Sequence, residues 1–338
     1  MLGDTEVVPS PDPAVSAVRS AVRRFLASAD AVPFAEAPLV VACSGGADSL
    51  ALAAAVAHVA PRRVRALVVD HQLQAGSAEV AARAAEQVRR MGCEDVRVCR
   101  AEVRGPGGAE AAARRARYDV LSQESPDDAL VLLGHTLDDQ AETVLLGLGR
   151  GSGPRSIAGM RPLSPPWARP LLDTSRVTTR KACSALGLEP WDDPHNVDPT
   201  FTRARLRGEV VPLLEEVLQG GVAEALARTA AQLQDDSDAL DALGSRLRGE
   251  AHVRDELDTE VLAAWPAAVR RRALREWLYA RGVPELDDRH LRAADALVGR
   301  WRGQGPHALP GGFELRRAHG RLRVDDGGHA CTAGATGG

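Results

Sequence analysis

The stretch LVVACSGGADS, residues 39–49, passes from an apolar run into a polar turn that contains two glycines. A segment rich in alanine and leucine follows it to about residue 60. This pattern predicts a buried strand, a tight loop and a helix that begins directly after the loop. Glycines allow the backbone to approach an oxyanion closely, and the N–H groups at a helix N-terminus favour negative charge. The loop is therefore a candidate phosphate site, although the chain has no G-x-x-x-x-G-K-[ST] loop of the kind that transfers a γ-phosphoryl group.

Two further apolar runs and the strand-like segment Val96-Arg97-Val98 alternate with helical patterns after this stretch. These strand candidates cover residues 64–69, 96–98 and 130–133, and the helical patterns cover about 77–91, 109–123 and 138–148. Continuously apolar strands that alternate with helices predict an α/β fold with a parallel sheet buried on both faces. Ligands of such sheets bind beyond the carboxyl ends of the strands. Three of these ends carry polar clusters, namely SGGADS, VDH and GHTLDDQAE, so we expect the active site there.

Length and composition bound the remaining possibilities. The chain has 338 residues, 44% hydrophobic and 26% charged, with a net charge of −4 that gives no global attraction to nucleic acid. The aromatic content of 3% argues against a platform that stacks many bases, and no apolar stretch is long enough to span a membrane. We expect loose tails at 1–13 and 328–338, an N-terminal catalytic domain at 14–220 and a smaller, mainly helical domain at 221–327 with a short β element near its end.

The cysteines favour a reducing compartment. Five are present, an odd number without a C-x-x-C pair, which argues against a disulfide framework or a zinc ribbon. We therefore expect a cytoplasmic protein. The 42 basic residues include a single lysine, Lys181, so nearly all of them are arginines. The number of arginines is therefore poor evidence for phosphate binding, and only their spacing is informative.

Carboxylates at two strand ends are candidates for metal or amine binding. In the loop, Ser44 and Ser49 supply hydroxyls, whereas Asp48 suits an anion site only if a cation such as Mg²⁺ accompanies the anion. Asp138, Asp139 and Glu142 lie within five residues at the start of a predicted helix. They could complement the helix dipole, but their position beyond a strand favours binding of Mg²⁺ or an ammonium group.

Three groups of arginines are candidate phosphate contacts. Arg114 and Arg117 share a helix face with Glu110, where surface ion pairs are an equal alternative. The alternating residues Arg203, Arg205 and Arg207 would project to one side if the segment is extended and would scatter if it is helical. Arg271 and Arg272 belong to a basic cluster in the second domain that is either a nucleic-acid contact or a solvated face.

The loop SGGADSLAL resembles the pyrophosphate-binding loop of the N-type ATP pyrophosphatases, which cleave ATP between its α and β phosphates. Within that group the chain resembles the tRNA(Ile)-lysidine synthase family. The matching blocks follow family order between about residues 39 and 215. They are VDHQL at 69–73, E-x-x-x-R-x-x-R-Y at 110–118, GHTLDDQAET at 134–143, GRGSG at 149–153, RPLL at 169–172, DPHN-x-D at 193–198 and R-x-R-x-R at 203–207. Gln74 departs from the basic residue or proline that is usual in the family.

The resemblance implies a reaction, its cofactors and its partners. The C2 oxygen of the wobble cytidine of isoleucine tRNA with a CAU anticodon attacks the α-phosphorus of ATP, and the ε-amine of L-lysine then displaces AMP. It implies ATP and Mg²⁺, with Asp48 and Asp138 as metal ligands and the loop residues Ser44, Gly45, Gly46 and Ser49 at the phosphates. Val69, His71, Gly134 and His135 would complete the nucleotide site, Asp70 would join the catalytic carboxylates, and the arginines would contact tRNA or phosphate. A homodimer is left open.

Other functions remain to be distinguished. A tRNA thiolase of the same loop family typically needs paired cysteines, and here only Cys93 and Cys99 lie close in sequence, flanking a predicted strand. A GMP or NAD synthetase would leave the blocks linked to tRNA unexplained. A non-catalytic ATP- or RNA-binding module would not need the carboxylates at the strand ends.

Overall fold

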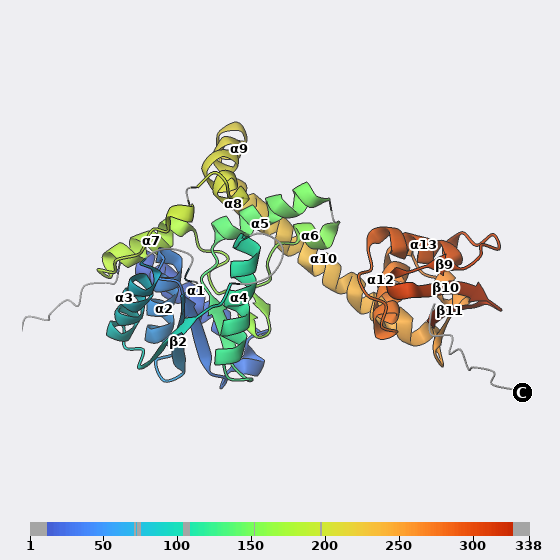
Figure 1. Ribbon diagram of the computed structural model, residues 1–338. Coiled ribbons are helices and arrows are strands. Elements are labelled where there is room, and N and C mark those ends of the chain that lie inside the picture. The colour runs from blue at the N-terminus through green and yellow to red at the C-terminus, as the bar shows by residue number, and fades with distance from the viewer. Residues whose placement is uncertain are drawn as a thin grey trace, which may run out of the picture. The chain divides into compact units, whose positions relative to one another are not determined.

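The computed structural model describes residues 12–70, 72, 76–103, 109–151, 153–196 and 198–326. His71 and the side chain of Glu110 lie outside the described part. The chain divides into two compact units, Met1–Ala231 and Gln232–Gly338. The division falls within helix α10 (Val222–Ala251), whereas the domain boundary predicted at 220/221 lies at the turn before this helix (Figure 1).

The N-terminal unit is built on a six-stranded sheet with the order β3-β2-β1-β4-β6-β5. The four predicted strands are β1 (Leu39–Cys43), β2 (Val64–Asp70), β3 (Asp95–Arg100) and β4 (Leu130–Leu133), and they pair in parallel, which confirms the α/β prediction. The two-residue strands β5 (Leu163–Ser164) and β6 (Trp167–Ala168) are too short for a sequence pattern to reveal them. Strand order runs outward from β1 in both directions, so a crevice lies beyond the carboxyl ends of β1 and β4.

Helices cover both faces of this sheet (Figure 1). Alternate residues of β1 face opposite sides: Leu39 and Val41 pack with one core cluster, and Val40 packs with another. The first cluster includes residues of α1 (Pro13–Leu26), α2 (Ala47–Val59), α3 (Ser77–Arg90) and α7 (Arg176–Ala185). The second includes Leu121 of α4 (Ala109–Glu124). Burial on both faces explains why the central strands β1 and β4 are apolar throughout, whereas the edge strand β3 carries charged residues and is only partly buried.

The remaining elements of this unit are short helices and turns, apart from α5. They are α5 (Leu137–Arg150), α6 (Pro154–Ile157), α8 (Thr202–Arg205), α9 (Val211–Val217), a π-helix at Leu206–Val210 and short 3₁₀ turns at Val32–Phe34 and Pro194–Asn196. The segment 202–217 is therefore helical throughout, and the extended alternative for its arginines is wrong.

The C-terminal unit combines helices with a five-stranded antiparallel sheet of order β7-β8-β11-β10-β9. Its strands are β7 (His252–Val253), β8 (Glu256–Asp258), β9 (His307–Ala308), β10 (Phe313–Ala318) and β11 (Arg321–Asp326). Its helices after α10 are α11 (Thr259–Ala263), α12 (Ala267–Ala280) and α13 (Asp288–Gly299), with a 3₁₀ turn at Pro310–Gly312. The predicted β element is the β10–β11 hairpin, and Trp277, Leu278, Leu315 and Leu322 lie in the core between sheet and helices.

None of the described helices combines the length and apolar character that a membrane span requires. The four cysteines in the described part, Cys43, Cys93, Cys99 and Cys183, are free thiols, as the sequence predicts.

Candidate active site

The loop between β1 and α2 is closed by its two serines. The Ser44 N–H donates to Ser49 Oγ at 3.1 Å, the two hydroxyls lie 3.2 Å apart, and the Ser49 hydroxyl donates to the Gly46 carbonyl at 2.9 Å. Gly45 has a φ of +83°, and a Cβ there would lie 3.1 Å from Cβ of Ala84 in α3. The N-cap of α2 is Gly46, which has no side chain to accept a hydrogen bond from the first N–H groups of the helix. These N–H groups can therefore donate to an anion.

Gly134 brings the end of β4 against this first turn. A Cβ on Gly134 would lie 3.0 Å from the carbonyl carbon and oxygen of Asp48 and from the amide nitrogen of Ser49. These are rigid backbone atoms, so glycine is required for the close approach. The two predicted strand-end clusters therefore meet directly.

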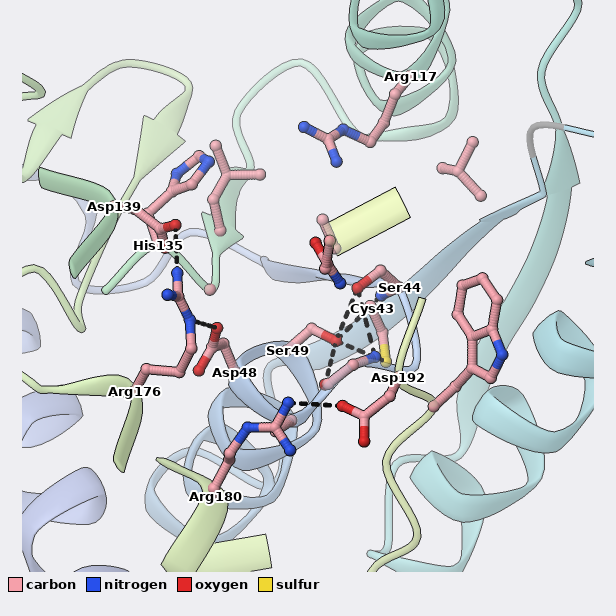
Figure 2. Close-up of a pocket in the computed structure, with 18 of the residues that line it drawn as sticks. Cys43, Ser44, Asp48, Ser49, Arg117, His135, Asp139, Arg176, Arg180 and Asp192 are labelled. Carbon is pink, nitrogen blue, oxygen red and sulfur yellow. Dashed lines mark hydrogen bonds and ion pairs between the residues drawn. The ribbon is translucent and has the colours of Figure 1, made fainter. Parts of the chain in front are cut away.

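A cavity of about 380 Å³ opens between these strand ends (Figure 2). This volume lies within the range of small-molecule sites. Its lining combines loop, carboxylate and arginine groups: Ala42, Cys43, Ser44, Gly46, Ala47, Asp48, Ser49, Leu67, Val69, Arg117, Leu133, Gly134, His135, Asp139, Arg176, Arg180, Trp191, Asp192, Asn196 and Arg207. A second cavity of about 280 Å³ shares Val69, Arg117 and Trp191 with the first and also has Asp70 in its lining.

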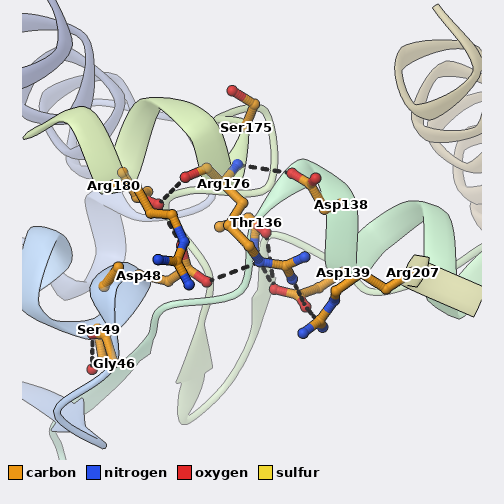
Figure 3. Close-up of polar contacts among 12 residues, drawn as sticks. Gly46, Asp48, Ser49, Thr136, Asp138, Asp139, Ser175, Arg176, Arg180 and Arg207 are labelled. Carbon is orange, nitrogen blue, oxygen red and sulfur yellow. Dashed lines mark hydrogen bonds and ion pairs between the residues drawn. The ribbon is translucent and has the colours of Figure 1, made fainter. Parts of the chain in front are cut away.

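Arg176, the first residue of α7, links the carboxylates of two strand ends (Figure 3). Its guanidinium lies 2.7 Å from Asp139 Oδ1, 3.4 Å from Asp48 Oδ2 and 3.7 Å from Glu142 Oε1. Its backbone N–H donates to Asp138 Oδ2 at 2.8 Å. The sequence prediction did not include Arg176 as a site residue.

Glu142 is a buried carboxylate, with its side chain only 1% exposed. Arg207 donates to it from Nε at 2.9 Å and from a terminal nitrogen at 3.3 Å, and Arg203 donates to it at 3.4 Å. Arg203 and Arg207 are four residues apart in a helical segment, so they share a face. Arg205 points elsewhere and pairs with the exposed Glu209 at 2.9 Å. The structure therefore brings two of the three predicted arginines into the site.

The pKa values of the two best-placed aspartates shift in opposite directions. Burial raises the pKa of Asp48, although Thr179, whose hydroxyl donates to Asp48, and Arg176 oppose the shift. Burial would also raise the pKa of Asp139, but Arg176 and the Thr136 N–H bond outweigh it and hold that pKa below the usual value. Asp139 is thus an ionised carboxylate, stabilised by neighbouring donors.

The two predicted Mg²⁺ ligands differ in their surroundings. Asp48 lines the first cavity beside the loop, where one carboxylate could hold Mg²⁺ together with phosphate oxygens of a nucleotide. Asp138 does not line either cavity; its carboxylate accepts the first N–H of α7 instead. In the described part of the chain no three His, Cys, Asp or Glu side chains group together as metal ligands would. The donor set therefore fits a cation shared with a nucleotide at Asp48.

His135 lies in a cation-rich part of the cavity. Burial lowers the pKa of His135 to about 3. The nearby Asp139 carboxylate opposes this shift, whereas the positive charges of Arg169, Arg117 and Arg114 reinforce it. The imidazole is therefore neutral at physiological pH. Its Nδ1 is buried and has no hydrogen-bond partner among the described residues.

Arg117 and Arg114 surround Tyr118 of α4. Arg114 donates to the Tyr118 hydroxyl at 3.1 Å, and the Arg117 guanidinium carbon lies 5.7 Å from the ring centroid. Within the described residues Arg117 forms no ion pair with a carboxylate, and its buried Nε has no partner. Burial lowers the pKa of Arg117, and Arg114 reinforces the effect. A cation in this position is best stabilised by an anionic ligand in the cavity.

The remaining predicted residues differ in position. Val69 lines both cavities, and Asp70 is buried, accepts the Gln72 N–H at 2.9 Å and lines the second cavity. In the C-terminal unit, Arg272 pairs with Asp241 at 2.6 Å and its side chain is 16% exposed. Arg271 lies 4.0 Å from Asp295 and is 28% exposed. The sequence left two alternatives for this cluster, a solvated face and a nucleic-acid contact. Neither describes Arg272 fully, because its guanidinium forms an ion pair with Asp241 of the same unit.

Several site residues were not predicted: Arg176, Arg180, Trp191, Asp192 and Asn196, which line the first cavity, and Thr179, which donates to Asp48. Two signals could have found some of them. Ser175 is the N-cap of α7 and precedes Arg176, which places that arginine in a first helical turn. Trp191 and Asp192 directly precede the DPHN block, Asn196 is its last residue, and the Trp191 N–H donates to the Gly45 carbonyl at 2.9 Å.

Comparison with known proteins agrees with this geometry. A family model described as a PP-loop domain matches residues 16–214, and a TilS substrate binding domain model matches 257–323. The tRNA(Ile)-lysidine synthase of Rhodococcus jostii is 55% identical over 321 residues, covering 93% of this chain and 96% of that protein. The chain belongs to the tRNA(Ile)-lysidine synthase family. The predicted resemblance is therefore confirmed.

Other members of the tRNA(Ile)-lysidine synthase family give the same result. The Nocardia farcinica protein is 57% identical and covers 91% of this chain and 97% of its own length. The Mycobacterium tuberculosis H37Rv protein is 56% identical, and the match covers 80% of this chain and 83% of that protein. The family consists of ATP-using carbon–nitrogen ligases, as predicted.

One solved structure supports the fold. The U34-tRNA thiolase NcsA from Methanococcus maripaludis, with its [4Fe-4S] cluster, aligns with a TM-score of 0.53 at 16% identity, covering 66% of this chain and 80% of that one. Here Cys93 lies before β3, at the amino ends of the strands, and Cys43 is the cysteine that lines the first cavity. The described residues thus offer no cysteine pair in that cavity.

Proposed function

We propose that this chain is a tRNA(Ile)-lysidine synthase. It joins L-lysine to C2 of the wobble cytidine of isoleucine tRNA with a CAU anticodon, through an adenylated cytidine, and releases AMP and pyrophosphate. The product changes the codon read from AUG to AUA. One observation carries the proposal beyond family membership: the anion-binding loop at 44–49 and the ionised Asp139 line the same cavity. A phosphate site and an amine site would therefore adjoin.

The loop would stabilise the first step, in which the cytidine C2 oxygen attacks the α-phosphorus of ATP. N–H groups of the first turn of α2 and the hydroxyls of Ser44 and Ser49 would donate to the leaving pyrophosphate as it gains charge. Mg²⁺, held by Asp48 and phosphate oxygens, would neutralise part of that charge. Arg117, which has no carboxylate partner among the residues that the structure describes, would supply a cation at the same cavity. Val69 lines the junction of the two cavities, where the nucleoside would lie.

The acidic pair would orient lysine in the second step. One amine of lysine remains protonated and would bind Asp139 and Glu142, whereas the attacking amine must be neutral to use its lone pair. Its attack on C2 forms the carbon–nitrogen bond and expels AMP, because adenylation has made the C2 oxygen a good leaving group. Family resemblance assigns the attack to the ε-amine.

The C-terminal unit would hold the tRNA. The substrate binding domain model covers residues 257–323, which include Arg271 and Arg272. Arg271 is the more exposed of the two and is the better candidate for a phosphate contact. A tRNA substrate and free thiols favour a cytoplasmic location. A homodimer remains an expectation, which light scattering would test.

The decisive assay combines purified protein, Mg-ATP, labelled lysine and transcripts of two tRNAs. We expect label in isoleucine tRNA with a CAU anticodon and none in methionine tRNA with the same anticodon. AMP and pyrophosphate should accumulate in equal amounts. Release of ADP and phosphate, or sulfur incorporation in place of lysine, would refute the proposal.

A variant of the loop aspartate tests the assigned chemistry. Asp48→Asn removes the charge that would hold Mg²⁺ while retaining an acceptor for Thr179. Pyrophosphate release should fall by about a hundredfold or more, as for loss of one preorganised electrostatic contact. The melting temperature of the variant serves as the control for folding.

A further inference from the structure

Donors from the protein already occupy most of the acceptor capacity of Asp139 and Glu142. Asp139 Oδ2 accepts the Thr136 N–H at 2.9 Å and the Thr136 hydroxyl at 3.0 Å, and Oδ1 lies 2.7 Å from Arg176 and 3.5 Å from Arg207. Glu142 is surrounded by three guanidinium groups, those of Arg176, Arg207 and Arg203. A carboxylate offers about four lone-pair directions. Each carboxylate accepts three hydrogen bonds from described residues, so an incoming ammonium group must compete with the guanidinium groups for this pair.

Arg176 is the arginine best placed to leave. It lies between the acidic pair and the loop, because the same guanidinium that contacts Asp139 also contacts Asp48 at 3.4 Å (Figures 2 and 3). Its distance of 3.7 Å from Glu142 is the longest of the three arginines. A polyphosphate bound at the loop would offer it a stronger partner within reach, since arginine forms bidentate bonds to phosphate.

We infer that Arg176 competes with the amine substrate for Asp139 and Glu142, and that a nucleotide at the loop relieves this competition. The inference rests on the proposed function, because it takes the acidic pair as the amine site. Arg176 is then a positioning residue that makes the two substrates bind cooperatively. Cooperative binding would keep lysine out of the site until ATP can activate the cytidine.

Thermodynamic linkage gives the size of the effect. If nucleotide tightens lysine binding, lysine must tighten nucleotide binding by the same factor. Couplings between sites are typically about 5- to 150-fold. We therefore expect lysine to bind wild-type protein at least about fivefold more tightly in the presence of nucleotide.

Equilibrium dialysis with radiolabelled L-lysine tests the inference. The probe nucleotide is α,β-methylene ATP with Mg²⁺, whose bridging carbon prevents cleavage between the α and β phosphates. In wild-type protein the nucleotide should tighten lysine binding. In Arg176→Gln, lysine should bind without nucleotide about as tightly as it binds wild type with nucleotide. The matched control is Arg205→Gln, because Arg205 is exposed and pairs with Glu209 outside the cavity; it should keep the wild-type coupling.

Three results would overturn the inference: equal lysine affinity with and without nucleotide in wild type, full coupling retained in Arg176→Gln, or coupling lost in Arg205→Gln. If Arg176→Gln does not fold, Arg176→Lys decides, since its shorter ammonium cannot contact Asp48 and Asp139 together and the coupling should fall. Unchanged coupling in Arg176→Lys would also overturn it. Failure of the proposed function looks different, because wild-type protein would then transfer no lysine to tRNA at any concentration.

Discussion

Replacing Glu142 by glutamine tests whether the buried acid holds the active-site arginines in place. The substitution keeps the shape of the side chain but removes its charge. One end of the amide would present N–H groups to guanidinium donors, so three arginines would lose their shared acceptor. We expect a less stable N-terminal unit and a disordered amine site.

The magnitude follows from burial. Breaking a buried ion pair by removing one partner costs about 3–5 kcal/mol. Arg203 and Arg207 retain side-chain exposures of 32% and 30%, so water can solvate part of their charge. This partial solvation reduces the expected loss to about 2–3 kcal/mol. For a unit of this size about 1 kcal/mol shifts the melting temperature by about 2–4 °C, so we expect a decrease of roughly 5–10 °C.

Differential scanning calorimetry of the full chain measures this shift. Glu209→Gln is the matched control, because Glu209 also pairs with an arginine of the same segment but is exposed. Its melting temperature should stay at the wild-type value. Equal melting temperatures for Glu142→Gln and Glu209→Gln would refute the assignment of Glu142 as the charge that organises the site.

Three further predictions concern other parts of the molecule. Gly134→Ala should raise the KM for ATP and cost about 1–3 kcal/mol of stability, because its Cβ meets rigid backbone of α2; unchanged pyrophosphate-release kinetics would contradict this. His135 has a folded pKa near 3, below its ordinary value of 6.5, so the unfolded state takes up the proton first and His135 lowers stability as pH falls from 6.5 towards 3. Its NMR ring signals should therefore show no titration near pH 6.5. Arg271→Ala should reduce the salt dependence of tRNA binding by about one phosphate contact without loss of stability, since Arg270 remains paired with Asp295 at 2.7 Å; an unchanged slope would exclude the contact.

The nucleotide half of the site could be predicted because its signals are local. An apolar run followed by SGGADS predicts a strand, a loop and a helix N-terminus, and parallel strands necessarily end at one edge of their sheet. Asp48, Gly134 and Asp139 follow the carboxyl ends of two parallel strands, which predicts that they lie together, and the structure brings all three to one cavity. Conclusions of this kind need only residue type, spacing and the rules of α/β topology.

Tertiary structure decided which charges pair, because ion pairs join residues far apart in sequence. Nothing near Glu142 indicates that Arg203 and Arg207 neutralise it, or that Arg176 reaches from α7 to the loop. Alternating arginines are compatible with a strand as well as with a helix. In the folded chain the segment is helical, and Arg205 therefore points away from the cavity and pairs with Glu209. The sequence by itself thus predicts a site beyond the carboxyl ends of β1 and β4. The fold determined which charged side chains form ion pairs there, because burial and partners distant in sequence set the free energy of each ionised group.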